Sequence, residues 1–188
     1  MKKRVIKFHY NSPVVLSFAL ISLCVLALDF FSSGWTTVKL FSVYRSSMRD
    51  VFTYPRFVLH VLGHADYSHY INNMMMILVV GPPLEERYGS NGLFWAIFMT
   101  AFVSGMFHWL VFPGVMLLGA SGIVFMMIVM SSLSGMKDGC IPITLILVGV
   151  LYLGGEIIGG FVLKDNISQL THVIGGVCGA ILGMGMRK

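Results

Sequence analysis

The chain has 188 residues, of which 56% are hydrophobic and only 11% are charged, and its mean hydropathy is +0.83. Soluble domains usually carry about 25% charged residues, so the composition excludes an ordinary soluble domain and indicates a polytopic membrane protein. The net charge of +5 does not indicate a nucleic-acid partner, because basic residues gather before the first apolar segment and after the last one.

Apolar segments recur along the whole chain and predict six transmembrane helices. The segments cover residues 12–31, 66–81, 92–112, 120–135, 141–161 and 169–186. Each of these segments, at roughly 16–21 residues, can cross or nearly cross a ~30 Å hydrocarbon layer at 1.5 Å per residue. We therefore expect an all-α polytopic membrane protein with a single domain over residues 1–188, because the connections are too short to separate cores.

The first apolar segment follows a basic start and resembles a signal peptide. No small-x-small cleavage site follows Asp29, so we expect a retained helix behind a short basic cytoplasmic segment of about residues 1–11. An even number of spans places both chain ends on one side of the membrane. The positive-inside rule makes this side cytoplasmic.

The connections between the segments carry further predictions. Residues 32–65 mix aromatic and charged side chains, which favours an element lying partly in the headgroup region of the membrane. Pro82-Pro83 is expected to end the second span, because proline cannot continue a hydrogen-bonded helix. Pro113-Gly114 separates the third span from a loop on the outer side.

Four polar side chains on three different spans are predicted to lie at a similar depth. If the termini are cytoplasmic, Ser121 and His69 each lie roughly 24 Å above the charged inner end of their span, and His172 roughly 22 Å. Asn73 lies one turn deeper than His69. Asparagine and histidine are costly in hydrocarbon, and they usually mark a function or an interhelical hydrogen bond.

Glycines predict that two of these spans approach each other closely. Gly175 and Gly179 follow His172 at helical spacing, and small residues on one helix face let a partner backbone come near. Gly119 and Gly122 could form the matching surface at the start of the fourth span. This contact would bring the imidazole of His172 to the hydroxyl of Ser121.

A serine and a histidine at this depth suggest acyl-transfer chemistry. Serine is a weak nucleophile until a base accepts its proton, and neutral histidine suits that role. No Asp or Glu lies at the depth needed to orient His172, so we predict a dyad rather than a triad. The oxyanion could be stabilised by the Ser121 N–H and the side chains of His69 and Asn73. This chemistry needs no metal or other cofactor.

Five short motifs occur in order along the chain from about residue 56 to 179, and together they resemble the rhomboid family of intramembrane serine proteases. The motifs are Arg56-x-x-x-His60, His64-x-x-x-x-His69-x-x-x-Asn73, Glu85-x-Arg87-x-Gly89, Gly119-Ala120-Ser121-Gly122 and His172-x-x-Gly175-x-x-x-Gly179.

The resemblance implies a six-helix bundle with a membrane-associated first loop, and cleavage of peptide bonds in or near transmembrane segments of membrane-protein substrates. It implies that Ser121 is the nucleophile, that His172 is the general base, and that His69 and Asn73 help to form the oxyanion hole. We expect a minimal bacterial member of the family that is located in the cytoplasmic membrane. The resemblance implies structural roles for Arg56, His64, Glu85, Arg87, Gly119, Gly122, Phe125, Gly175 and Gly179.

Two positions depart from the family pattern. Phe125 stands where many members carry a tyrosine against the catalytic histidine, which keeps a stacking surface and loses a hydroxyl. Pro55 stands where a tryptophan often precedes the loop arginine. We expect activity to survive if stacking is the main role of the aromatic ring.

Other interpretations of the same residues stay open. Ser121 and His172 could serve only in helix packing and an interhelical hydrogen bond, and His69 with Asn73 could form a structural polar cluster. Metal binding by His60, His64 and His69 is not expected, because their spacing fits no known motif. The main alternative function is a catalytically inactive rhomboid-like protein that binds membrane clients. A channel is disfavoured because the polar residues cluster near one face.

Overall fold

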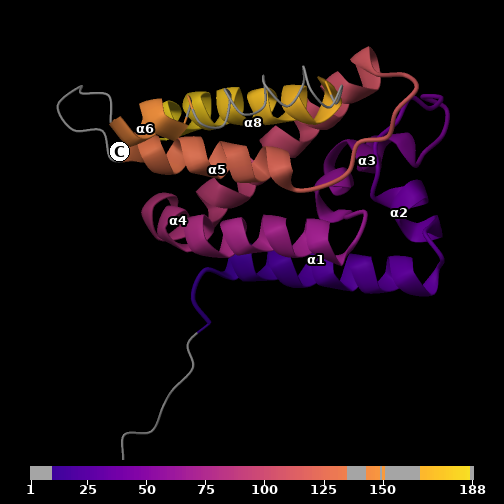
Figure 1. The fold of residues 1–188 in the computed structure, drawn as a ribbon, viewed down its shortest axis with the longest axis horizontal. Coiled ribbons are helices and arrows are strands. Elements are labelled where there is room, and N and C mark those ends of the chain that lie inside the picture. Colours follow the sequence, from indigo (N-terminus) through magenta and orange to yellow (C-terminus); the bar gives the residue numbers. More distant parts are fainter. Residues whose placement is uncertain (1–9, 135–142, 149, 151–165, 187–188) are drawn as a thin grey trace, which may run out of the picture.

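The computed structural model describes residues 10–134, 143–148, 150 and 166–186 (Figure 1). In this part of the chain the only pairing of extended backbone is a short antiparallel bridge between Val43 and Leu117. This confirms the all-α prediction for the described residues. The helices are α1 (Pro13–Phe31), α2 (Trp35–Leu40), α3 (Thr53–Leu59), the 3-10 turn η1 (His60–Leu62), α4 (Tyr67–Val111), α5 (Ser121–Ser134), α6 (Ile143–Val148) and α8 (Asn166–Gly185).

Two helix pairs dominate the arrangement. Figure 1 shows α1 beside the first part of α4, and α5 beside α8, with α4 in contact with both pairs. The short helices α2 and α3 lie at the end of the molecule remote from the C-terminus. The buried core between these elements is made of large apolar side chains, including Val15, Met74, Ile77, Leu93, Ile123, Met126 and Met130.

Among the described helices, two are long and apolar enough to cross a membrane. They are α1, with a mean hydropathy of 2.5, and α4, with 1.6. The apolar helix α5 and residues 170–185 of α8 are shorter. The first predicted span agrees with α1, whereas the predicted span 141–161 lies mostly outside the described residues, as do residues 1–9. The count of six membrane crossings stays a prediction.

The prediction that Pro82-Pro83 ends the second span is wrong. Helix α4 continues through both prolines and bends at Gly89, whose φ of 76° and ψ of 157° interrupt the helical backbone. Glycine adopts a positive φ at no steric cost. The segment after the prolines is held by tertiary contacts, since Leu84 and Glu85 are both buried. These contacts offset the cost of a proline inside a helix, about 3 kcal/mol.

The buried carboxylate of Glu85 fastens the start of α1 to α4. The residue before α1, Ser12, has a φ of 55° and makes no side-chain cap. Glu85 takes this role, because its carboxylate accepts hydrogen bonds from the N–H groups of Val14 and Val15, each at 3.0 Å. Ser90 donates to the same carboxylate at 2.7 Å. A negative charge at a helix N-terminus satisfies orphan donors and interacts favourably with the helix dipole.

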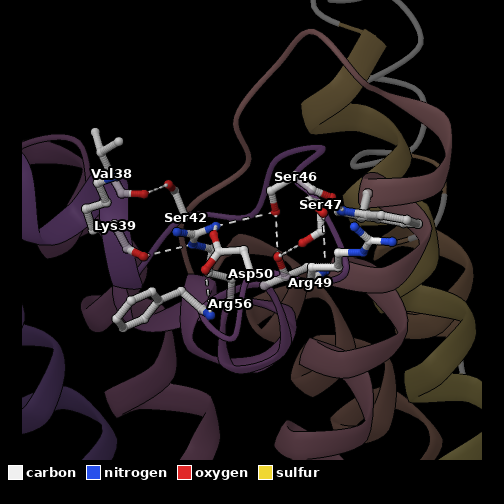
Figure 2. Close-up of polar contacts among 11 residues, drawn as sticks. Val38, Lys39, Ser42, Ser46, Ser47, Arg49, Asp50 and Arg56 are labelled. Atoms are coloured by element: carbon white, nitrogen blue, oxygen red, sulfur yellow. Dashed lines mark hydrogen bonds and ion pairs between the residues drawn. The ribbon is translucent and has the colours of Figure 1, made fainter.

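The segment between α1 and α4 is folded around a buried arginine. Arg56 is 1% exposed, and its Nε donates to the Lys39 carbonyl at 2.7 Å (Figure 2). Its guanidinium lies 3.4 Å from both the Ser46 hydroxyl and the Asp50 carboxylate, and 4.6 Å from the centre of the Tyr44 ring. These contacts hold residues 32–65 in a defined conformation, which agrees with the prediction of a folded element that was based on their aromatic content. Its depth in the membrane stays a prediction.

Candidate active site

The turn before α5 presents Ser121 at the first position of a helix. Gly119 in this turn has a φ of +118°, and its N–H donates to the His60 carbonyl at 3.0 Å. Ser121 itself is partly exposed. The first N–H groups of a helix have no acceptor within the helix, so the Ser121 N–H is available to an external oxygen.

The first turns of α5 lie against α8 through glycines. A methyl group added at Gly122 would lie 3.2 Å from Cγ2 of Thr171. Gly175 lies directly against the Gly122 carbonyl, and Gly179 lies against the Met126 carbonyl one turn further on. Any larger side chain at the two α8 positions would meet backbone, so glycine is what allows this close helix packing.

His172 lies on the turn of α8 that packs on the start of α5. Its imidazole stacks on the Phe125 ring, with centroids 4.2 Å apart and planes inclined by 7°. Both side chains are buried, at 8% and 7% exposure. Phe125 is one turn after Ser121, and Thr171, next to His172, contacts Gly122. Two contacts therefore join the serine region to the histidine region: Phe125 stacks on His172, and Gly122 contacts Thr171.

His69 lies at the start of α4 and faces the turn before Ser121. The Ala65 N–H donates to its Nδ1 at 3.5 Å, which leaves the ring proton of the neutral imidazole on Nε2. A methyl group added at Gly119 would lie 2.7 Å from both Nε2 and Cε1 of this ring. The donor edge of His69 therefore lies against the turn that leads into α5.

Helix α4 begins at a well-formed cap that fixes the position of His69. The Asp66 carboxylate accepts a hydrogen bond from the His69 N–H at 2.7 Å, which satisfies one of the donors at the helix start. Asn73, one turn on, donates from Nδ2 to the His69 carbonyl at 3.1 Å. An amide group carries two N–H donors, so this bond commits one of them.

Two further histidines pack beneath this region. The His64 ring lies 5.1 Å from the His69 ring and 5.6 Å from the Tyr70 ring. His60 is also buried, and its Nδ1 donates to the Arg56 carbonyl at 3.2 Å. Burial lowers the pKa of both His60 and His64 to about 4, so both rings are neutral near pH 7. These contacts support a structural role for both residues.

The remaining predicted residues lie elsewhere. Glu85 is sixteen residues after His69 in the sequence, roughly 24 Å away along α4, and it serves the start of α1. The Arg87 guanidinium lies 5.7 Å from the centre of the Tyr88 ring. In the part of the chain that the structure describes, no group of three or more His, Cys, Asp or Glu side chains is placed to hold a metal ion.

Two contributors to the site were missed in the sequence. Thr171 precedes Gly175 and Gly179 at a strict four-residue spacing, so the small-residue pattern could have included it. Ala65 acts through its backbone N–H, which leaves no signal in the side-chain pattern. The Thr171 contact depends on the packing of α8 against α5, whereas the Ala65 hydrogen bond is local to the start of α4.

Comparison with known proteins identifies the family to which the chain belongs. The family model described as the Rhomboid domain matches residues 52–188. The chain belongs to the rhomboid family. Two curated relatives of this rhomboid protein are the Rhomboid protease GlpG of Serratia proteamaculans, 33% identical over 132 residues, and the chloroplastic Rhomboid-like protein 11 of Arabidopsis thaliana, 27% identical over 142 residues.

Each alignment covers 68% of this chain, and it covers 46% of the Serratia protein and 50% of the Arabidopsis protein. The chain therefore spans about half the length of these curated relatives. Membership places it in a family of membrane proteins that includes a protease.

Proposed function

We propose that this protein is an intramembrane serine endopeptidase that hydrolyses peptide bonds in or near transmembrane segments of membrane-protein substrates. The observation that carries the proposal is the stacking of His172 on Phe125, one turn after Ser121. Family membership and the similarity to the Serratia protease support it. The proposal includes six membrane crossings, both termini in the cytoplasm, and residence in a bacterial cytoplasmic membrane.

The proposed reaction proceeds in two steps. The Ser121 hydroxyl oxygen attacks the carbonyl carbon of the scissile bond while His172 accepts the hydroxyl proton. The resulting oxyanion accepts hydrogen bonds from the Ser121 N–H and from Nε2–H of His69, and the free N–H of the Asn73 amide is a third candidate donor. His172 then gives its proton to the leaving amine, and the bond between carbon and nitrogen breaks.

Water completes the second step. A water molecule attacks the acyl-enzyme carbonyl while His172 accepts its proton, and the same proton returns to Ser121 as the new carboxylic acid leaves. No carboxylate is needed to orient the base in this scheme, because stacking on Phe125 fixes the plane of the imidazole. The scissile bond must be locally unwound, since a helical backbone shields its carbonyl with an internal hydrogen bond.

The direct test is cleavage of a model transmembrane substrate by the purified full chain in liposomes. The wild type should cleave, and Ser121→Ala and His172→Ala should not. Ser131→Ala is the matched control, because it removes a hydroxyl from the same helix far from the site. Equal product from the wild type and Ser121→Ala would refute the proposal and favour an inactive, client-binding member of the family.

A further inference from the structure

Residues 112–120 connect α4 to α5 and lead directly to Ser121; we call them the entry loop. Backbone groups on three alternate residues of this loop are hydrogen-bonded to other parts of the protein: Val115, Leu117 and Gly119. Leu117 exchanges two hydrogen bonds of 2.9 Å with Val43, and the Gly119 N–H donates to the His60 carbonyl at 3.0 Å. The entry loop is therefore tied down at every second residue from 115 to 119.

The tie at Val115 differs from the other two because a side chain makes it. Nε2 of His108 lies 3.0 Å from the Val115 carbonyl oxygen. A carbonyl oxygen can only accept a hydrogen bond, so Nε2 carries the proton and donates. In the neutral ring Nδ1 is then an acceptor; it is buried, and it has no hydrogen-bond partner among the described residues. The hydrogen-bonding capacity of the ring is thus directed to Val115.

Packing fixes the His108 side chain in the position from which it donates. The residue is 2% exposed, and its ring lies against the Phe112 ring, with centroids 5.3 Å apart. Burying a polar ring with an unpaired nitrogen costs free energy that an apolar side chain of similar size would avoid. A packing role alone therefore does not explain a histidine at this position, whereas the hydrogen bond to Val115 does.

The end of α4 that carries His108 is itself anchored. The Arg45 guanidinium donates to the carbonyls of Trp109 and Leu110, at 2.7 and 2.6 Å, and lies 4.9 Å from the centre of the Trp109 ring. Nε1–H of Trp109 donates in turn to the Ser46 carbonyl at 3.3 Å. The last carbonyls of a helix have no partner within it, and a cation is favourable there. His108 therefore donates from a helix end that is held on the segment between α1 and α4.

The entry loop places the donors of the proposed oxyanion site. Gly119 lies against the donor edge of the His69 ring, and the Ser121 N–H follows two residues later. Val115 is four residues before Gly119, so release of its carbonyl would free the first half of the loop. The remaining ties would then have to hold the turn against the motion of the freed half.

We propose that His108 is a positioning residue for the reaction. Its hydrogen bond holds the Val115 carbonyl, which sets the path of the entry loop and thereby the direction in which the Ser121 N–H points. His108 acts through the loop rather than on the substrate. This role rests on the proposed proteolytic function.

Substitutions that match or shorten the imidazole test the proposal in the liposome cleavage assay with the purified full chain. The terminal N–H of His108→Gln reaches as far as Nε2 and keeps the donor, whereas the amide of His108→Asn ends near Nδ1 and His108→Leu has no donor. Loss of the hydrogen bond should lower kcat about tenfold and leave KM within about twofold. His108→Gln should stay within about threefold of the wild type. Phe107→Leu, on the exposed side of the same turn, is the control and should leave kcat unchanged.

Hydrogen–deuterium exchange of the same variants reports on the loop without any substrate. The N–H groups of Leu117 and Gly119 should exchange about tenfold faster in His108→Asn and His108→Leu, and at the wild-type rate in His108→Gln. Unchanged exchange in His108→Asn would overturn the tie, and faster exchange with unchanged kcat would overturn the positioning role. Equal kcat for His108→Gln and His108→Asn would also overturn it.

The two readouts separate this proposal from the proposed function. If the wild type cleaves no more than Ser121→Ala, the proposed function fails and the positioning role falls with it. The exchange rates then still decide whether His108 holds the entry loop. If His108→Leu does not fold, the pair His108→Gln and His108→Asn decides both questions.

Discussion

Replacing Gly119 by alanine is the sharpest perturbation that the candidate site offers. The added methyl would lie 2.7 Å from Nε2 and Cε1 of His69, whereas carbon atoms normally approach to about 3.5–4.0 Å. The imidazole must therefore move by about 1 Å. The φ of +118° adds a backbone penalty for any residue other than glycine, about 1–3 kcal/mol.

A displacement of about 1 Å in a positioned catalytic group can lower a rate about 100-fold, equal to about 2.7 kcal/mol of transition-state stabilisation. We therefore expect kcat/KM of Gly119→Ala to fall about 100-fold in the liposome cleavage assay. Gly114→Ala is the control, because a methyl there has no neighbour within 4 Å. If folded Gly119→Ala cleaves within about threefold of the wild type, His69 does not act from this position.

Three further predictions follow from the packing. Gly175→Ala places a methyl against the Gly122 carbonyl and should lower the free energy of unfolding by about 1–3 kcal/mol, which thermal unfolding in detergent measures. The control is Gly176→Ala, whose added methyl has its nearest contact 3.8 Å away; it should leave stability unchanged or raised. Equal effects of the two changes would contradict the α5–α8 contact. Phe125→Leu removes the ring that stacks on His172, an interaction worth about 0.5–1.5 kcal/mol, so kcat in the liposome assay should fall about 2- to 10-fold. Phe125→Tyr keeps the ring and should stay active. A wild-type rate for the leucine variant would contradict the stacking role. In the folded chain the pKa of His60 and of His64 is lowered from 6.5 to about 4, so protonation favours the unfolded chain. The contribution of the two rings to stability is therefore complete above pH 6.5 and is lost as the pH falls toward 4, by up to about 3 kcal/mol for each ring. Unfolding measured at pH 7 and pH 4.5 checks this, and a flat profile would contradict it.

The helical architecture could be predicted because it depends on local composition. The apolar run that became α1 and the break at Pro113-Gly114 agree with the structure, since both reflect the chemistry of neighbouring residues. Pro82-Pro83 misled for the opposite reason. Contacts from a distant helix, above all the hydrogen bonds from Val14 and Val15 to Glu85, keep that turn helical, and no local pattern contains them.

The candidate site shows the same division. The positions of Ser121 and His172 on two different helices could be predicted from the spacing of glycines and from depth along each span. The details that govern chemistry could not. The proton on Nε2 of His69 depends on a backbone N–H from Ala65, and the room for its ring depends on the absence of a side chain at Gly119.

Labelling with a fluorophosphonate tests most directly whether His172 activates Ser121. Mass spectrometry of the labelled wild type should locate a single adduct on Ser121. His172→Phe keeps an aromatic ring against Phe125 and removes the base, so its labelling should be slower by at least about 100-fold. Labelling of His172→Phe at the wild-type rate, or an adduct on another serine, would contradict the account.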